Sequence, residues 1–210
     1  MNQKNLKLTS ELREILVGKL LGDGHLETQN KGKTWRLKIE HSIKQKEYVM
    51  HQYKIFSEWV LSPPRIITKQ NSQNFGFQTI STGRLRFYGQ KFYKKGKKII
   101  PKIIGKLITA RSLAYWYSDD GSIKSKESKG TIFNTHGFSL SEVKFLCNVL
   151  QEKFVLDCRP RKQKEGWQIY VSGKSYSQLR EIIYPFLLPE MFYKFPSERK
   201  IRKLTSLPKK

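Results

Sequence analysis

The sequence predicts an α+β protein built from two similarly organised halves. Three observations lead to this prediction: an apolar helical run ending in aspartate and glycine occurs twice, strand-like segments follow each copy, and each half contains one strongly amphipathic helix. The repeated Asp-Gly pairs begin at Asp23 and Asp120 of the 210-residue chain. We therefore predict a first repeat over residues 1–105 and a second repeat over residues 106–210.

A helix is the first element expected in each half, followed by strands. LVGKLLGDG and LAYWYSDDG are apolar runs whose final glycine is typical of a helix C-terminus. In the first half, KTWRLKIEHS then alternates strictly, so that Trp35, Leu37 and Ile39 share one face. This alternation predicts a strand with one buried face, and KSKESKGTIFNTHGFS is its weaker counterpart in the second half.

An amphipathic helix comes next in each half. KQKEYVMHQYKIFSEWVL and SLSEVKFLCNVLQEKF repeat apolar residues at helical spacing, and Ser139 and Glu142 in the second are spaced as a capping box. A pair of short basic strands follows each helix, RIITKQ with FGFQTIST and CRPRKQ with WQIYVSG. Each half closes with a helical segment and a Lys-Pro signal, KKIIPK or YKFP, and therefore contains about four strands and three helical segments.

Neither predicted sheet could bury both of its faces within one half, so we expect the halves to pack together through their first helices. The distance between packed helices depends on the size of the side chains at their contact. Small residues recur at a four-residue spacing on both helices: Gly18 and Gly22 on the first, Ala114 and Ser118 on the second. The alternative is that these are ordinary small residues.

If the first helices lie side by side, Asp23 and Asp120 meet at their C-terminal ends. A helix C-terminus carries partial negative charge, so a carboxylate there needs a positive partner. Carboxylate and backbone carbonyl oxygens are hard ligands that suit Mg²⁺, and paired metals near a phosphate can activate a water. The pattern predicts metal-assisted phosphodiester hydrolysis; the alternative is that each Asp-Gly is only a helix end and a turn.

The composition indicates a polyanionic partner. The chain has 41 Lys and Arg against 17 Asp and Glu, a net charge of +24, and nucleic acid is the usual partner of such a protein. No apolar run approaches the roughly 20 residues that span a bilayer, and the first residues lack the apolar core of a signal peptide. With two cysteines and no CxxC pair, we expect an intracellular, reducing compartment and no membrane partner.

Both acid-ending runs resemble the two signature motifs of the LAGLIDADG homing endonucleases, in their single-chain, two-repeat form. WVLSPP, SLAYWYSDDG and YKFP are similar to the branch that contains the omega-intron endonuclease of yeast mitochondria. The resemblance runs from Leu12 to Pro196. It implies two αββαββα repeats related by a pseudo-twofold axis, whose curved antiparallel sheets form a DNA-binding saddle.

The resemblance also implies an activity and a setting. It implies a monomer that makes a double-strand break in a long double-stranded DNA target and promotes intron mobility. Mg²⁺ would support cleavage, whereas Ca²⁺ would support binding without cleavage. A gene in a mitochondrion, a chloroplast or a prokaryote would be typical of the family, and host intron RNA would be a further partner.

The resemblance assigns the catalytic metals to the final acid of each motif, Asp23 and Asp120, helped by the backbone carbonyls of Gly22 and Asp119. Two departures from the family pattern stand out. Lys19 interrupts the apolar run of the first motif, and Asp119 adds an acid where the first motif has Gly22. We interpret Lys19 as a residue of the core or of the helix contact.

Lysines and strand residues complete the predicted site. The resemblance implies a catalytic lysine near each scissile phosphate, Lys98 in KKIIPK and Lys194 in YKFP, with Lys97 as the alternative to Lys98. DNA contacts are expected from the polar faces of the strands, where Arg, Lys, Gln and Asn can reach base edges or phosphates. The candidates are Arg36, Lys38, Glu40, Arg65, Lys69, Gln78 and Thr79 in the first half, and Lys124, Lys126, Asn134, Arg159, Arg161, Lys162 and Gln168 in the second.

Three alternatives stay open on the sequence alone. An RNA-binding intron maturase or splicing factor of the same fold would carry the same charge. A different nuclease fold could use Asp120 with Glu142 and Lys144, but that motif belongs on a strand and here lies in a capped helical turn. A non-enzymatic basic protein would keep its function after Asp23→Asn. Metal-dependent DNA cutting distinguishes the endonuclease from the RNA-binding maturase.

Overall fold

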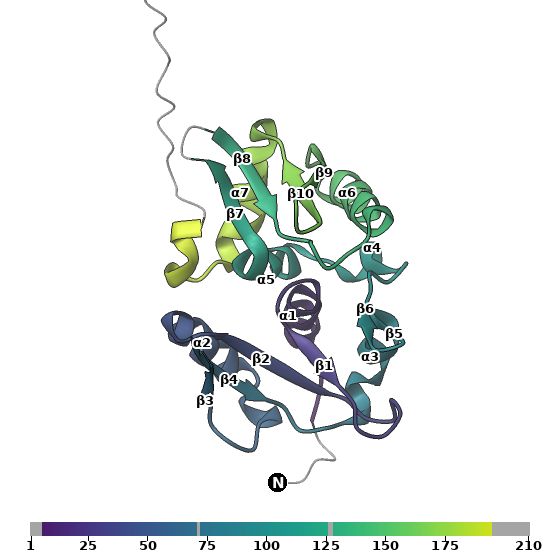
Figure 1. Cartoon of the computed structure of the whole chain (residues 1–210), viewed down its shortest axis with the longest axis vertical. Helices are drawn as coiled ribbons and strands as arrows, with labels where there is room; N and C mark the ends of the chain where they lie inside the picture. Colours follow the sequence, from purple (N-terminus) through teal and green to yellow (C-terminus); the bar gives the residue numbers. More distant parts are fainter. Residues whose placement is uncertain (1–5, 71, 126–127, 195–210) are drawn as a thin grey trace, which may run out of the picture.

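The computed structural model of the chain describes residues 6–70, 72–125 and 128–194. Two antiparallel sheets, each with its own helices, lie on either side of a central pair of helices, α1 and α5 (Figure 1). The buried apolar side chains of both halves form one hydrophobic cluster. Within the described ranges, no helix has both the length and the apolar character needed to cross a membrane.

The elements follow the predicted order in both halves. The first half contains α1 (Ser10–Leu21), β1 (His25–Glu27), β2 (Arg36–Ser42), α2 (Lys46–Ile55), β3 (Arg65–Lys69), β4 (Ser72–Gln78), α3 (Arg86–Phe92), β5 (Tyr93–Lys94) and β6 (Lys97–Lys98). The second contains α4 (Ile104–Leu107), α5 (Ala110–Asp120), β7 (Gly121–Ser125), β8 (Ser128–Phe133), α6 (Leu140–Phe154), β9 (Cys158–Lys162), β10 (Trp167–Val171) and α7 (Tyr176–Ile183). Short 3-10 helices are Ile43–Gln45, Ser57–Trp59, Gly83–Leu85, Gly173–Ser175, Tyr184–Phe186 and Pro189–Lys194. The repeat boundary after residue 105 stays a prediction, and it falls inside α4.

Both halves contain a four-stranded antiparallel sheet with the same strand order, β1-β2-β4-β3 in the first and β7-β8-β10-β9 in the second. The predicted α+β class with about four strands per half is thereby confirmed. In β2 the alternation has its expected effect, because Leu37 and Ile39 are buried while the alternating residues Lys38 and Glu40 are partly exposed. The apolar face of each sheet packs on helices, and the polar face points away from them.

The two amphipathic helices agree with the sequence to different degrees. On α6 the capping box is present: Glu142 N donates to Ser139 Oγ at 3.4 Å, and Ser139 N donates to Glu142 Oε2 at 2.9 Å. α2 is shorter than predicted, since it ends at Ile55 and a 3-10 turn then buries Trp59. The Pro63-Pro64 pair beyond this turn disfavours further helix.

α1 and α5 pack closely, as the glycines predict. A Cβ added at Gly18 would lie 2.4 Å from the backbone oxygen of Ser112 and 2.8 Å from Cβ of Tyr115. A Cβ added at Gly22 would lie 2.5 Å from Oδ2 of Asp119. Real Cβ atoms essentially never approach other atoms so closely, so this helix contact requires glycine at both positions of α1.

The α5 atoms nearest to these glycines do not come from the small residues Ala114 and Ser118. Both residues are buried, and Ser118 Oγ donates to the Ala114 carbonyl at 2.9 Å. The α5 atoms nearest to Gly18 instead belong to Ser112 and to the large residue Tyr115. Because glycine on α1 already makes room, α5 does not need small side chains at the contact.

Candidate functional site

The motif acids lie at the neighbouring C-terminal ends of α1 and α5. Asp23 directly follows Gly22, which ends α1, and Asp120 is the last residue of α5. The two ends are joined by a hydrogen bond, because the Asp23 backbone N–H donates to Asp119 Oδ2 at 2.9 Å. The side chain of Asp23 is 49% exposed, and Asp120 is half-buried. Asp23 is therefore open to a ligand, and Asp120 is the more buried of the two acids.

Electrostatic repulsion perturbs both motif acids. Burial raises the pKa of Asp23, and the nearby Asp119 charge raises it further. The pKa of Asp120 is raised well above its usual range, chiefly by burial and then by Asp23 and Asp119. Two such carboxylates at helix C-termini form a hard oxygen donor set with excess negative charge, which fits a divalent cation such as Mg²⁺.

Lys98 reaches the end of α1. Its Nζ donates to the backbone oxygens of Gly22 and Gly24, both at 2.8 Å. Lys97, the alternative considered from the sequence, is exposed. Burial lowers the pKa of Lys98, whereas the acids Asp120, Asp119 and Asp23 raise it, in that order. The Lys98 ammonium thus supplies positive charge at the C-terminal end of α1, which carries partial negative charge.

Lys194 occupies the corresponding place at the end of α5. Its Nζ donates to the backbone oxygens of Ser118, at 2.5 Å, and Asp119, at 2.8 Å. Burial lowers the pKa of this lysine too, and the carboxylates of Asp119 and Asp120 oppose the shift. Each half therefore brings one acid and one lysine to the same helix end.

A buried ionic network lies beside Asp23, and sequence reasoning missed it. Lys19 Nζ lies 2.7 Å from Asp119 Oδ1, and both side chains are 0% exposed. Tyr48 donates its hydroxyl to the same oxygen at 2.9 Å. His41 connects the pair to the motif acid, because its Nε2 lies 2.9 Å from Lys19 Nζ and its Nδ1 lies 3.5 Å from Asp23 Oδ2.

This network explains both departures from the family pattern. Lys19 in the first motif and Asp119 in the second compensate each other across the helix contact, and Lys19 is the largest of the effects that lower the pKa of Asp119. The sequence did contain a signal, since two opposite charges replace residues of an apolar pattern. His41 and Tyr48 had none, because each looks like an ordinary residue of its strand or helix.

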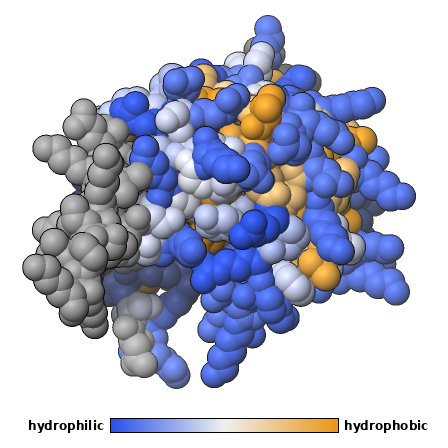
Figure 2. All heavy atoms as spheres, turned by 90° about the horizontal axis from the view of Figure 1, so that it is seen from above, coloured by the Kyte–Doolittle hydropathy of each residue, from blue (hydrophilic) through white to orange (hydrophobic). Residues whose placement is uncertain are grey.

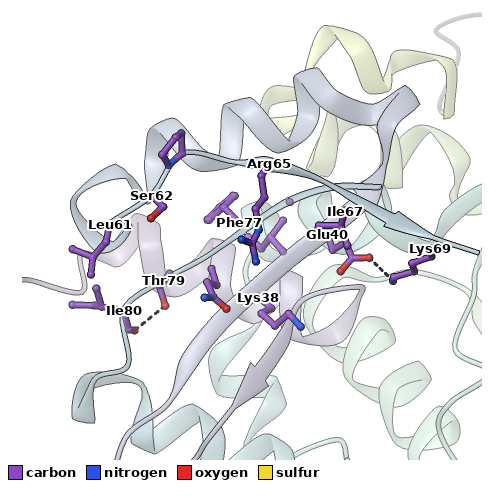
Figure 3. Close-up of a pocket in the computed structure, with 14 residues that line it drawn as sticks. Lys38, Glu40, Leu61, Ser62, Arg65, Ile67, Lys69, Phe77, Thr79 and Ile80 are labelled. Carbon is purple, nitrogen blue, oxygen red and sulfur yellow. Dashed lines mark hydrogen bonds and ion pairs between the residues drawn. The ribbon is translucent and has the colours of Figure 1, made fainter. Parts of the chain in front are cut away.

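Most predicted DNA contacts of the first half lie on one surface. A groove runs along the outer face of the first sheet (Figure 3). The candidates that line it are Lys38, Glu40, Arg65, Lys69, Gln78 and Thr79, although Thr79 is itself nearly fully buried. Glu40 pairs with Lys69, and the remaining candidate, Arg36, donates to Glu27 at 2.9 Å. These acids hold neighbouring cations in place on the outer face.

Candidates in the second half also share an outer face. Arg159 and Lys124 lie over the ring of Tyr170 at 5.2 and 5.4 Å. Gln168 Nε2 donates to Asn134 Oδ1 at 2.7 Å. Gln168 is paired with Arg161 across the strands, so Arg161 lies on this face as well. Tyr170, which the sequence analysis did not select, supports two of the cations through cation–π contacts.

Two candidates are corrected by the structure, and one cannot be placed. Thr79 is buried, with its hydroxyl bound to Leu37 N and the Ile80 carbonyl. Lys162 lies over Trp167 at 4.9 Å, on the side of the sheet that carries the buried Ile169. Lys126 lies outside the described residues.

The surface agrees with the composition. Viewed from above, the molecule is covered mainly by hydrophilic side chains with small apolar patches between them (Figure 2). Together with the net charge of +24, this surface suits a polyanion. The geometry thus combines two acid–lysine sites at adjoining helix ends with basic outer faces on both sheets.

Comparisons with known proteins agree with this arrangement. The model of the LAGLIDADG DNA endonuclease family matches residues 13–179. A probable intron-encoded endonuclease of Wickerhamomyces canadensis is 35% identical over 193 residues, which cover 86% of this chain and 82% of the relative. DNA endonuclease I-ChuI of Chlamydomonas applanata is 29% identical, over 90% of this chain and 96% of the relative.

A solved structure and a relative of different function complete the comparison. The homing endonuclease I-WcaI bound to its DNA recognition sequence has a TM-score of 0.85 and 32% identity, over 90% of this chain and 88% of that chain. A cytochrome b mRNA maturase of Debaryomyces hansenii is 26% identical, over 90% of this chain and 75% of the relative. The resemblance noted in the two motifs is thereby confirmed, and the chain belongs to the LAGLIDADG DNA endonuclease family.

Proposed function

We propose that the protein is a homing endonuclease that uses Mg²⁺ at Asp23 and Asp120 to cut both strands of a long DNA target as a monomer, and so promotes intron mobility. The observation that carries this proposal is the pair of acids at adjoining helix ends, each accompanied by a lysine. When bound, the metal would polarise the phosphodiester and supply an activated water. The genome involved would be that of an organelle or a prokaryote.

The chain's own residues have separate tasks in this proposal. Asp23 and Asp120 hold the cation, together with the backbone oxygens of Gly22 and Asp119. Each of these backbone oxygens also accepts from a lysine, and the second lone pair of a carbonyl oxygen remains for the cation. The carboxylate of Asp119 is excluded from this task, because Lys19, Tyr48 and the Asp23 N–H bind its two oxygens. Lys98 and Lys194 place an ammonium beside each site, where negative charge develops on the phosphate.

DNA would lie across the outer faces of the two sheets. In the first half we propose contacts from the groove residues and Arg36; in the second half, from Lys124, Asn134, Arg159, Arg161 and Gln168. Acidic partners such as Glu27 and Glu40 keep several of these cations extended toward the outer face. We assign no contact to Thr79, because its hydroxyl is bound to backbone groups. We assign none to Lys162, because it lies on the side of β9 opposite to Arg161.

The decisive experiment compares cutting with binding. A pool of randomised duplexes, incubated with the protein in Mg²⁺ and separately in Ca²⁺, should yield one long motif that is cut in Mg²⁺ and only bound in Ca²⁺. Asp23→Asn and Asp120→Asn should then abolish or severely reduce cutting of this target while binding in Ca²⁺ persists. The matched control is Asp157→Asn, at an exposed aspartate, which should cut normally. Joint loss of binding and cutting would instead assign the motif acids a structural role.

RNA splicing is the second candidate, and the maturase relative is the observation that favours it. A maturase would bind its host intron RNA and accelerate splicing whether or not the motif acids are intact. Binding and splicing assays with Asp23→Asn therefore separate the two activities. If the protein neither cuts nor binds any duplex in the randomised pool, RNA becomes the preferred substrate.

A further inference from the structure

We infer that Lys19, Asp119, Tyr48 and His41 form a positioning network for Asp23 that has no counterpart at Asp120 among the described residues, so that the two DNA strands are cut by unequally supported acids. The inference rests on the proposed function of Asp23 and Asp120 as metal-binding acids. It concerns how Asp23 is held, and it assigns the four residues no direct contact with substrate.

Asp119 forms the rigid centre of this network. Its Oδ1 accepts from Lys19 Nζ at 2.7 Å and from the Tyr48 hydroxyl at 2.9 Å, and its Oδ2 accepts from the Asp23 backbone N–H at 2.9 Å. Its side chain is 0% exposed. A buried carboxylate with both oxygens bound keeps its orientation, so the backbone of Asp23 is anchored to the opposite helix.

His41 extends the network to the Asp23 side chain. An ammonium has donors and no acceptor, so the 2.9 Å contact with Lys19 Nζ requires His41 Nε2 to accept. A ring nitrogen that accepts a hydrogen bond carries no proton, so this contact leaves the His41 ring neutral. Its single proton must then lie on Nδ1, which is 3.5 Å from Asp23 Oδ2. The ring is thus oriented to donate toward the acid.

The same atoms also resemble a cation site, but Lys19 excludes that function. Ligand atoms of Asp23, His41 and Asp119 lie within 4.8 Å of one another. The Lys19 ammonium contacts two of the three residues, where it supplies the positive charge that a metal would bring. The cluster therefore orients Asp23 rather than holding a second metal.

The second half lacks these features at the equivalent positions. Matching Asp23 with Asp120 places Trp116 at the position of Lys19 and Gly22 at that of Asp119. The Trp116 indole interacts with the Asp120 side chain, but it is neutral and brings no ion pair. In the sheets, His25 pairs with Lys38 and Ser122 pairs with Ile132. His41 lies three residues after Lys38, and Thr135 lies three residues after Ile132. Thr135 therefore occupies the position in the second half that His41 occupies in the first. Thr135 donates to the Trp167 carbonyl at 2.8 Å, so its hydroxyl is engaged away from Asp120.

Strand-resolved single-turnover cleavage tests the inference. The duplex target selected above is labelled differently on each strand, and Asp23→Asn and Asp120→Asn identify the strand that depends on each acid. His41→Leu should slow the Asp23-dependent strand by about 10- to 100-fold more than the other, as expected for loss of a group that orients a metal ligand. His41→Asn keeps an N–H near the place of Nδ1 and should restore part of this rate. Thr135→Val is the matched control and should leave the ratio of strand rates unchanged.

Several results would overturn the inference. Equal slowing of both strands by His41→Leu, with no rescue by Asn, would mean that His41 serves only the fold. If His41→Leu cleaves both strands at the wild-type rate, the network does not contribute to cleavage. If Asp23→Asn and Asp120→Asn each slow cutting of both strands alike, neither acid is specific to one strand and the inference fails. If neither variant slows cutting, the proposed function itself fails.

A second measurement does not depend on cleavage or on metal. The ¹⁵N resonances of the His41 ring in the metal-free protein at neutral pH should show a neutral ring protonated on Nδ1. Lys19→Met combined with Asp119→Asn removes both charges of the buried pair, and the preference for Nδ1 protonation should weaken in that double variant. A ring protonated on Nε2, or a charged ring, in the wild-type protein would contradict the network. This test still decides the question if His41→Leu fails to fold.

Discussion

The ion pair between Lys19 and Asp119 shows how two unusual residues of the motifs depend on each other. Both side chains are 0% exposed, and an unpaired charge in such a place would be strongly destabilising. Tyr48 and His41 contribute further polar contacts. A single change at Lys19 or Asp119 therefore leaves a buried charge without its partner, whereas the paired change does not.

The pKa of Asp120 leads to a prediction about stability. This pKa lies well above the ordinary value of 3.8 because of burial and the neighbouring acids. As pH rises from that ordinary value through the folded-state pKa, the unfolded chain releases its proton first, so the folded state binds more protons and loses stability. Asp120→Asn removes this loss. In metal-free buffer, the variant should be more stable than wild type at neutral pH, and the difference should shrink toward acid pH.

Chemical denaturation over a pH series measures this effect. Asp157→Asn, at an exposed residue, is the control and should follow the wild-type curve. Asp119, whose pKa is lowered, stabilises the fold above the acid range in both proteins, so its contribution cancels in the comparison. A neutral-pH stability of Asp120→Asn below that of wild type would show that the carboxylate is favourably bound and not strained.

At the scale of elements, the contact between α1 and α5 is the feature that brings the two sites together. Helix geometry places Gly18 and Gly22 on one face, four residues apart, and the packed helix leaves no room for a Cβ at either position. The sequence correctly predicted this contact on α1. It did not predict Tyr115 opposite Gly18, because the fit of a large side chain into a gap depends on both helices.

Gly18→Ala should therefore destabilise the protein by about 1–3 kcal/mol, the usual cost of overpacking a core. The added methyl group would meet a backbone oxygen of Ser112, which cannot move aside as a flexible side chain could. Gly137→Ala is the matched control, because a Cβ there meets no atom of the described residues within 4 Å and the backbone is not in the left-handed region. Thermal or urea unfolding of both variants measures the difference; equal stability would mean that the helices separate at little cost.

The molecule as a whole presents a basic surface of two similar sheets. The outer faces carry cations that are partly oriented by acids or aromatic rings. Because phosphate contacts release counterions, DNA affinity should fall steeply with salt, with a log–log slope of about −0.9 per phosphate neutralised. This dependence should exist for the selected target and for unrelated DNA alike.

Two substitutions test which surface residues cause the salt dependence of DNA binding. Arg65→Ala and Arg159→Ala, one on each sheet, should each reduce the salt slope by about one if the arginine contacts a phosphate. Lys144→Ala is the control, since Lys144 is exposed on α6, the helix that packs against the second sheet. Binding in Ca²⁺ over a range of salt concentrations supplies the slopes. A salt slope that is unchanged in both arginine variants would mean that DNA phosphates do not contact these arginines on the outer faces.

Local patterns in the sequence determined the order of helices and strands, the capping box at Ser139, the repeated acids and the basic character of the partner surface. Such features depend on residues a few positions apart, whose periodicity reports which side of an element is buried. The end of α2 was missed for a related reason: the burial of Trp59 in a 3-10 turn depends on the rest of the core.

Only the tertiary structure decided which residues surround the acids. Lys19 and Asp119 lie in different halves, and His41 lies in β2 of the first sheet. Their contacts exist because α1 packs on α5 and the first sheet lies against α1. It likewise decided that Lys98 rather than Lys97 reaches the helix end, and that the Thr79 hydroxyl is bound to backbone groups. Contacts between distant residues follow from packing and register, which no short stretch of the sequence contains.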